Sequence, residues 1–250
     1  MSDYRKKLYA NYVSTHVLPR KGRATLEEFQ SRAFVYQKRF GPFLPQPKSS
    51  MMIDIGCGNG SVTWWLQQNG FANAEGIDIN PEQIEEGRRL GVKNLKQADA
   101  VEYLKGRRNL YEAIFMRDFL EHFNKDEIIE MLDICRRSLK DKGRIIVQAP
   151  NAESPFFGRI RYGDFTHENA FTVSSLSQLL KSTGFNEVQF CSYKPIVLGI
   201  KSMFRYILWM MIEACYKAML SIELGRGSRI VTQTMIAVGI KSRTPGIKKA

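Results

Sequence analysis

The sequence predicts an α/β protein built on a doubly wound, mainly parallel sheet. Short apolar segments of strand length alternate with amphipathic segments of helix length, which is the pattern of repeated strand–helix–strand units. The first unit, residues 52–68, places a glycine-rich turn between a buried strand and a helix. Acidic residues follow the predicted strands at their carboxyl ends, the edge where open α/β sheets bind their ligands.

The glycine-rich turn is the most informative segment of the chain. Its glycines are Gly56, Gly58 and Gly60. They leave the backbone open to a ligand, and a helix that begins at Ser61 directs its free N–H groups at the same place. Such a turn suits a small ligand that carries a carboxylate or a phosphate. A dinucleotide site would have its third glycine one residue later.

The remaining elements follow in order along the chain. We expect strands at 74–79, 93–97, 112–116, 144–148 and 187–193, and helices at 61–68, 81–90, 101–105, 125–140 and 196–224. Asn80 and Pro81 suit the N-cap and the first position of a helix. Asn124 begins a sequence like a capping box, and Gly143 suits the end of the helix that follows.

Two acids mark the ends of the second and third strands. Asp78 lies roughly 20 residues after the glycines, where a nucleoside site needs a carboxylate to accept from both ribose hydroxyls. The alternative role for Asp78 is only to cap the next turn. Asp99 by itself predicts an N-cap, but a cap and a ligand lie at the same helix mouth, so Asp99 can serve both.

In this order, the glycines and acids resemble class I S-adenosylmethionine-dependent methyltransferases, whose first motif is acidic-x-Gly-x-Gly-x-Gly. The resemblance covers roughly residues 50–190. It implies a Rossmann-like sheet of seven strands with an antiparallel last strand over 232–241, and S-adenosyl-L-methionine as cofactor. It assigns the adenine amino group to Asp99. The implied cofactor-binding residues are Asp54, Gly56, Cys57, Gly58, Gly60, Asp78, Ile79, Asp99, Ala100 and Arg117.

The composition suits one large cytoplasmic domain with additions. A chain of 250 residues can bury a substantial core, and its first ten residues are too charged and polar for a secretory signal. The four cysteines are scattered, which indicates reduced thiols and no disulfide framework. No His, Asp or Glu cluster has metal-ligand spacing, so we expect no metal.

The net charge of +12 resides at the two ends of the chain. Residues 1–50 contain ten Lys or Arg and three acids, and residues 191–250 contain ten and two. Basic ends could contact nucleic acid, an anionic membrane or a pyrophosphate-bearing substrate, or form a solvated surface without a partner. Nucleic acid is the least favoured target, because base amino-methylating enzymes usually have a Pro-Pro turn after the fourth strand and this chain has no Pro-Pro.

Three segments are expected to determine the acceptor. Residues 1–50 are rich in aromatics and predict a helical lid over the methyltransferase domain, residues 51–250. Within that domain, residues 151–171 form a substrate loop and residues 195–229 an amphipathic helical insert. The loop concentrates ionisable groups, as a site for a charged or hydroxylated acceptor would. They are Arg159, Arg161, Asp164, His167 and Glu168.

Two motifs narrow the resemblance further. The segments 117–122 and 161–168 are similar to methyltransferases encoded in bacterial surface-polysaccharide clusters (O-antigen and capsule), and more distantly to ubiquinone-pathway O-methyltransferases. This chain departs from many of these relatives at Glu112, where they have an aspartate. The implied function is O-methylation of a sugar hydroxyl, with a glycan or lipid-linked glycan as the acceptor. The alternatives are a quinone-like or small phenolic acceptor, or a non-catalytic cofactor-binding subunit of an assembly.

Methyl transfer from a sulfonium releases a neutral leaving group, so the protein must align the nucleophile and remove its proton. We predict His167 as the base, oriented by Asp164 or Glu168, with His122 as its rival. Arg159 and Arg161 are expected to hold an anionic group of the acceptor, and loop bracing is an equal alternative for both.

The helix predicted at 196–224 has one polar and one apolar half. Lys201, Arg205, Glu213 and Lys217 interrupt its hydrophobic sequence, and Arg226 and Arg229 follow it. It therefore either lies in the interface of an anionic membrane, at the inner face of the cell membrane, or packs its apolar half on the domain or on a second subunit of a homo-oligomer.

Overall fold

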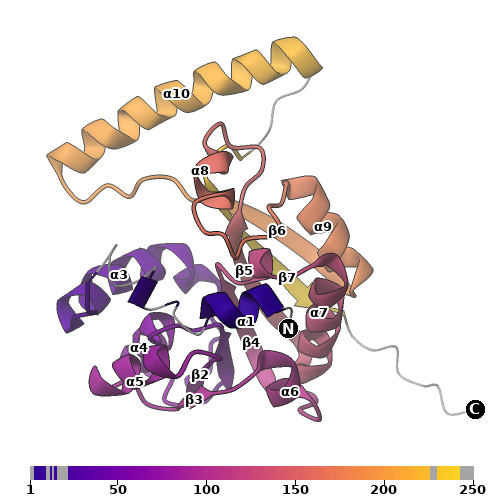
Figure 1. The fold of residues 1–250 in the computed structure, drawn as a ribbon. Coiled ribbons are helices and arrows are strands. Elements are labelled where there is room, and N and C mark those ends of the chain that lie inside the picture. The colour runs from indigo at the N-terminus through magenta and orange to yellow at the C-terminus, as the bar shows by residue number, and fades with distance from the viewer. Residues whose placement is uncertain (1–2, 10–11, 13, 16–21, 226–229, 243–250) are drawn as a thin grey trace, which may run out of the picture.

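The computed structural model describes residues 3–9, 12, 14–15, 22–225 and 230–242, and it confirms the predicted fold class (Figure 1). One seven-stranded sheet has the order β3-β2-β1-β4-β5-β7-β6. β7 runs antiparallel to both of its neighbours, and the other paired strands are parallel. The strands are β1 Met52–Ile55, β2 Ala74–Asp78, β3 Leu95–Gln97, β4 Tyr111–Arg117, β5 Leu139–Pro150, β6 Phe185–Ser192 and β7 Thr234–Lys241.

Helices cover both faces of this sheet (Figure 1). The described helices are α1 Asp3–Tyr9, α3 Leu26–Arg39, α4 Ser61–Gln68, α5 Pro81–Arg89, α6 Ala100–Leu104, α7 Lys125–Ser138, α8 Phe157–Arg161, α9 Val173–Ser182 and α10 Ile200–Leu224, with 3₁₀ turns η2 Gly41–Phe43 and η3 Leu120–His122. The predicted N-caps are confirmed: Asn80 accepts from two backbone N–H groups of α5, and Asn124 forms a capping box with Glu127.

The end of α7 differs from the prediction. The helix stops at Ser138, two residues before the expected end at 140, because Leu139 is buried and already pairs with Tyr111 of β4. The chain then turns through Lys142, which has a left-handed backbone with φ of 62°. Tertiary pairing therefore ends this helix, and Gly143 lies within β5 rather than after the helix.

The N-terminal region contributes to the core as well as covering the sheet edge. Phe29, Tyr36 and Phe40 of α3 are 0–2% exposed. The rings of Tyr36 and Phe40 lie 5.8 and 6.3 Å from Trp65 of α4. The helix α3 therefore packs as part of the domain, and α1 has the position expected of a lid. Residues 10–11, 13 and 16–21 of that segment lie outside the described residues.

The close approach of α5 to the glycine turn provides a test of this packing. A Cβ atom at Gly87 would lie 2.5 Å from the backbone oxygen of Asn59. Gly87→Ala should therefore lower the free energy of unfolding by about 1–3 kcal/mol, although Gly→Ala in a helix normally raises it by about 1 kcal/mol. Urea denaturation measures both. The control is Gly158→Ala in α8, where the Cβ would make only an ordinary 3.9 Å contact, and equal stabilisation by both changes would contradict the packing argument.

Candidate active site

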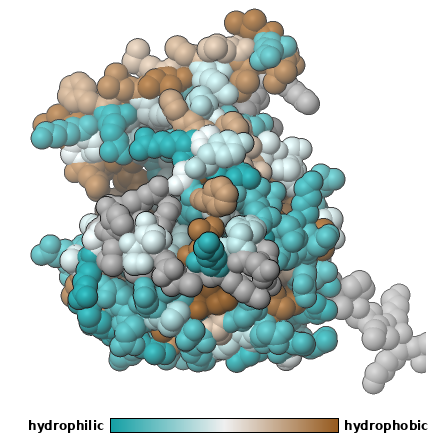
Figure 2. Space-filling model, viewed as in Figure 1, coloured by the Kyte–Doolittle hydropathy of each residue, from teal (hydrophilic) through white to brown (hydrophobic). Residues whose placement is uncertain are grey.

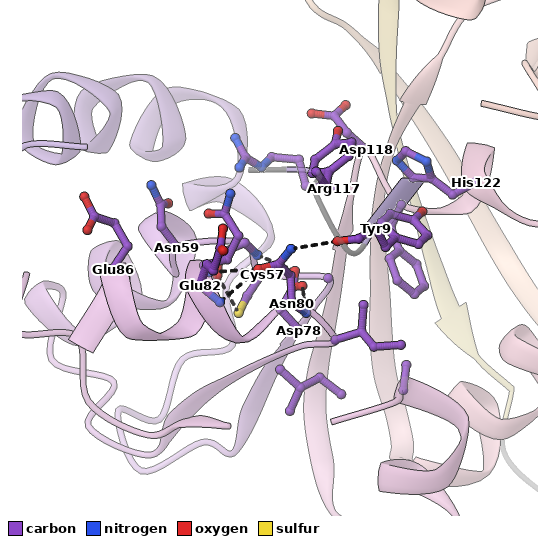
Figure 3. A pocket seen from close by; sticks show the side chains of 18 of the residues that line it. Tyr9, Cys57, Asn59, Asp78, Asn80, Glu82, Glu86, Arg117, Asp118 and His122 are labelled. Carbon is purple, nitrogen blue, oxygen red and sulfur yellow. Dashed lines mark hydrogen bonds between the residues drawn. The ribbon is translucent and has the colours of Figure 1, made fainter. Parts of the chain in front are cut away.

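A cavity of about 780 Å³ opens at the carboxyl edge of the sheet (Figure 3). The ends of β1, β2, β3 and β4 form its floor, and residues of α1 and α3 form its roof. Most of the residues predicted to bind a cofactor line it: Gly56, Cys57, Gly58, Asp78, Ile79, Asp99, Ala100 and Arg117. Asp54 and Gly60 do not line it. The ordered strand ends thus bring together side chains that are far apart in sequence.

At two of its glycines the turn presents bare backbone to the cavity. Gly56 has a φ of 66°, and a Cβ there would lie 2.3 Å from the ring of Phe119, which also lines the cavity. Gly58, with φ of 55°, has no such obstacle. Gly60 is the N-cap of α4, and its Cβ would contact Leu95 at 2.9 Å. Gly60 therefore serves packing behind the turn, and Gly56 and Gly58 form the cavity wall.

Asp78 is fixed by two backbone N–H groups. Its carboxylate accepts from Gly58 and from Asn80, each at 2.8 Å. Burial raises the pKa of Asp78, and these hydrogen bonds oppose that rise. Because a carboxylate has about four lone-pair sites, acceptor capacity remains for a diol. This donor set fits the ribose of the expected cofactor.

Asp99 has one oxygen engaged and one available. Its Oδ1 caps α6 by accepting from Val101 at 2.9 Å and Glu102 at 3.1 Å, whereas Oδ2 accepts from no described residue. The apolar side chains of Ile79, Ala100 and Val101 line the same part of the cavity. A polar acceptor beside apolar walls suits an adenine ring and its amino group.

Asp54 and Arg117 lie next to the cavity floor. Asp54 is 2% exposed, and burial raises its pKa to about 7, although the nearby cation of Arg117 and a hydrogen bond from Thr63 lower it. Arg117 donates to the hydroxyl of Tyr36 at 2.9 Å, and that hydroxyl lies 2.9 Å from Ser61 Oγ. A half-buried cation near a buried acid therefore connects β1, β4 and α3.

A second cavity of about 610 Å³ adjoins the first. Both are lined by Tyr12, Arg32, Arg117, Asp118 and His122. Four residues of the predicted acceptor site line the second cavity: His122, Arg159, Asp164 and His167. The guanidinium of Arg159 makes no ion pair or hydrogen bond with a described residue. The two cavities are therefore neighbours that share part of their lining.

The imidazole rings of His122 and His167 are in edge-to-face contact, with ring centroids 4.7 Å apart. Nδ1 of His167 lies 2.9 Å from the carbonyl oxygen of Ile160, which can only accept, so Nδ1 carries the proton and Nε2 is left as a base. The predicted orientation of His167 by Asp164 or Glu168 is therefore wrong, because the Ile160 carbonyl performs it.

His122 is held by a different chain of hydrogen bonds. Its Nδ1 lies 2.9 Å from Oγ1 of Thr166, which donates its own proton to Asp164 at 2.6 Å. Tyr12 also donates to Asp164, at 2.7 Å. Burial, together with His167, lowers the pKa of His122 to about 4. His122 is therefore neutral and weakly basic near neutral pH.

Arg161 and Glu168 support the cavity walls without lining either cavity. Arg161 donates to the backbone oxygens of His167 and Glu168. Glu168 pairs with Arg5 of α1 at 2.5 Å, and Arg5 pairs with Glu127 of α7 at 2.8 Å. The structure thus gives Arg161 the bracing role that was its alternative, and it gives Glu168 the task of holding α1 against the domain.

Sequence reasoning missed Glu121 and Tyr36. Glu121 is 1% exposed and lines the second cavity, and its carboxyl oxygens accept from no described residue. Burial raises its pKa well above the usual value. No signal in the sequence distinguishes a buried glutamate from an exposed one here. Among the described residues, no three His, Cys, Asp or Glu side chains are grouped to hold a metal.

Comparison with known proteins identifies the family. Residues 28–189 match a family model described as a methyltransferase domain, and this match includes α3 and ends within β6. The chain belongs to the methyltransferase domain family. No curated protein matches this methyltransferase.

Solved structures share its fold. An S-adenosylmethionine-dependent methyltransferase from Archaeoglobus fulgidus has 24% identity and a TM-score of 0.62, and the match covers 86% of this chain and 97% of that chain. One from Thermotoga maritima has 19% identity and a TM-score of 0.58, covering 86% and 91%. A Haemonchus contortus phosphoethanolamine N-methyltransferase in complex with S-adenosyl-L-methionine has 14% identity and a TM-score of 0.59, covering 94% and 60%.

These comparisons confirm the prediction of an S-adenosylmethionine-dependent methyltransferase with a Rossmann-like fold. The residues of the first cavity fit that cofactor, through Asp78 and Asp99 and through the bare backbone at Gly58. The finer resemblance to polysaccharide-cluster and ubiquinone-pathway enzymes stays a prediction.

Asp78 provides a direct test of the cavity. Asp78→Asn should weaken binding of S-adenosylhomocysteine about 10- to 100-fold, because the amide cannot accept as many hydrogen bonds and carries no charge. Isothermal titration calorimetry measures the affinity. Asp126→Asn, at an exposed position in the first turn of α7, should bind like the wild type. Equal affinities for all three proteins would contradict the role of Asp78.

Asp54 predicts a pH dependence of stability. Its pKa is raised in the folded protein, so folding favours the protonated carboxyl. The free energy of unfolding is therefore highest below the usual pKa of 3.8 and falls as the pH rises towards 7. Over that range the loss is about 4 kcal/mol. Asp54→Asn should remove this dependence of the free energy of unfolding on pH, as measured by urea titrations from pH 4 to 8. Asp133→Asn, at an exposed position of α7, should keep it. The same slope in wild type and Asp54→Asn would refute the burial argument.

Proposed function

We propose that this methyltransferase transfers a methyl group from S-adenosyl-L-methionine to a sugar hydroxyl of a cell-surface polysaccharide or of its lipid-linked precursor. The observation that carries the proposal is the free Nε2 of His167 in a cavity that adjoins the cofactor cavity. A sugar hydroxyl is a poor nucleophile at neutral pH, so it needs such a base.

The cofactor and His167 have separate roles in the proposed reaction. When bound, the cofactor supplies a methyl group on a sulfonium, whose loss leaves a neutral thioether. No residue is therefore needed to protonate the leaving group. The carbonyl of Ile160 holds the proton of His167 on Nδ1, so that Nε2 accepts the proton of the acceptor hydroxyl and becomes an imidazolium. The new bond joins the methyl carbon to the hydroxyl oxygen.

Arg159 is the proposed ligand for an anionic group of the acceptor. Arg159 lines the second cavity, and its guanidinium has no ion pair within the described residues. A phosphate or a uronate would supply the missing partner, and a guanidinium binds either through two parallel hydrogen bonds. Both groups occur in glycan precursors, which favours a sugar acceptor.

The aromatic wall of the second cavity favours one alternative. Tyr12, Tyr36 and Tyr193 line it, and they would accommodate a quinone-like or small phenolic ring as well as a sugar. A role as a cofactor-binding subunit of an assembly is the third candidate. A complex from Haloferax volcanii unites the Trm112 methyltransferase activator with a protein of this fold, at 13% identity and a TM-score of 0.60.

The proposed acceptor also suggests a location. A lipid-linked glycan precursor is held at the inner face of the cell membrane, so we place the enzyme in the cytoplasm, in peripheral contact with that face. The acceptor is tested by incubating the purified chain and labelled cofactor with lipid-linked glycans from cells that lack the gene. Mass spectrometry should find one added methyl group on a sugar. Transfer only to phenolic compounds would favour the alternative, and no transfer to either would refute both.

His167 is the residue that decides the mechanism. His167→Ala should lower kcat about 10²- to 10⁴-fold, because the acceptor loses its base. Its affinity for S-adenosylhomocysteine should stay unchanged, since His167 does not line the cofactor cavity. Glycan methylation and calorimetry measure the two effects. His122→Asn is the matched comparison, and a kcat loss that is large for His122→Asn but small for His167→Ala would assign the base to His122.

A further inference from the structure

The helix α10 turns its apolar side away from the protein. The space-filling view shows brown, hydrophobic side chains along the upper margin of the molecule, where α10 lies in Figure 1 (Figure 2). Phe204, Met211 and Ile222 are 59, 61 and 86% exposed. The other exposed apolar side chains of this helix are Ile200, Met203, Ile207, Leu208, Met210, Ile212, Met219 and Leu224. The predicted apolar half therefore exists, but it covers no part of the described domain.

The opposite side of α10 faces inward and carries polar, charged and aromatic side chains. Its less exposed residues recur at helical spacing: Ser202, Tyr206, Trp209, Glu213, Tyr216, Lys217 and Leu220. Glu213 is the only buried residue of the helix. An isolated amphipathic helix on a soluble domain has the reverse arrangement, with its apolar stripe on the core.

Two ion pairs of the buried Glu213 hold the helix in this orientation. The carboxylate of Glu213 pairs with Lys194 at 2.9 Å and with Lys217 at 2.6 Å. The two ammonium groups lower the pKa of Glu213 despite its burial. Rotating the helix to bury its apolar side would break at least the pair with Lys194, and it would leave a charge without its partner. The outward direction of the apolar side is thus a property of the fold.

The exposed face is too large for a surface with no partner. A helix of 25 residues is about 37 Å long, and the apolar side chains continue beyond it to Val197 and Leu198, which are also exposed. Monomeric soluble proteins rarely expose contiguous apolar patches of more than a few hundred Å². None of the described helices is long and apolar enough to cross a bilayer.

We propose that the outward face of α10 binds the surface of an anionic lipid bilayer, with the helix axis parallel to the membrane. The charges beside this apolar face favour an anionic membrane as its partner. Lys201 and Arg205 are exposed on the helix, against one exposed acid, Glu223. Arg226 and Arg229, which follow in the sequence, lie outside the described residues. Cations beside an apolar stripe match anionic headgroups above an acyl layer.

The position of α10 connects this surface to the acceptor cavity. Lys194, which anchors the helix, directly follows Tyr193, which lines the cavity. The helix α8 carries Arg159 of the cavity and lies between α10 and the sheet in Figure 1. Around α8, Tyr162 and Phe165 are 74 and 84% exposed. Membrane binding would therefore bring the acceptor cavity to the headgroup layer. Only this last step rests on the proposed function; the binding itself does not.

Vesicle flotation of the full chain tests the proposal. The chain should float with vesicles of phosphatidylcholine and phosphatidylglycerol at low salt, and added salt should weaken the binding. Phe204→Glu combined with Met211→Glu should reduce the bound fraction at least tenfold, because both side chains are exposed and the substitutions face the lipid. The control is Ile129→Glu, an exposed apolar residue on α7, which should float like the wild type.

Three outcomes would overturn the proposal. The first is that the wild type does not float with anionic vesicles, and the second is that the double variant floats equally well. The third is a wild-type dimer in sedimentation that the double variant converts to a monomer while no flotation occurs, which would assign the face to a second copy of the chain. Methyl transfer to delipidated glycan is measured on the same proteins, so failure of membrane binding and failure of the proposed function are distinguishable.

Quenching by brominated lipid tests the orientation of the helix. Phe204→Trp places an indole on the outward side, and Tyr206→Trp places one on the inward side. Brominated anionic vesicles should quench the added fluorescence of the first variant, and the second should show only the quenching of the wild type. Quenching of Tyr206→Trp alone would show that the helix binds by its polar side and would refute the proposed geometry.

Discussion

The half-buried guanidinium of Arg117 joins the parts of this methyltransferase that must stay in register. It lies at the end of β4, lines both cavities, and donates to Tyr36 of α3. A buried cation is costly unless it is paired and hydrogen-bonded, and Asp54, Asp118 and the hydroxyl of Tyr36 supply the compensation. Displacing α3, β1 or β4 would remove one of these partners. The boundary between donor and acceptor spaces is therefore also a point of structural stability.

The donor side of the site depends on local chemistry, and for that reason it could be predicted from the sequence. A strand end, a glycine turn and a helix mouth position Gly58, Asp78 and Asp99, and backbone N–H groups of these turns and helix ends hold both carboxylates. Their register follows from the alternation of strands and helices alone. The exceptions, Asp54 and Gly60, belong to the same motif but lie one layer deeper, a difference that the sequence pattern does not encode.

The acceptor side depends on contacts between distant segments, and the sequence could predict its residue types but not their tasks. His167 was identified, yet its orienting partner is a backbone carbonyl at Ile160, which no side-chain pattern indicates. Glu168 was expected at the acceptor, and it instead binds Arg5, 163 residues earlier in the chain. The burial of Glu121 and the outward face of α10 likewise arise from tertiary packing. The periodicity of the sequence predicts that this helix has one polar and one apolar side, but it does not predict which side packs against the rest of the protein.

The antiparallel β7 has a consequence for how this enzyme could be rebuilt. Because β6 and β7 are hydrogen-bonded neighbours, with Ser192 opposite Met235, the long segment between them leaves and re-enters the sheet at almost the same point. The pairing of β6 with β7 therefore does not depend on the length of the segment between them. The part of this segment that carries α10 could therefore be exchanged between relatives, which would replace the outward apolar surface. Tyr193, which lines the second cavity, and the buried residues Ile230, Val231 and Thr232 would stay with the sheet.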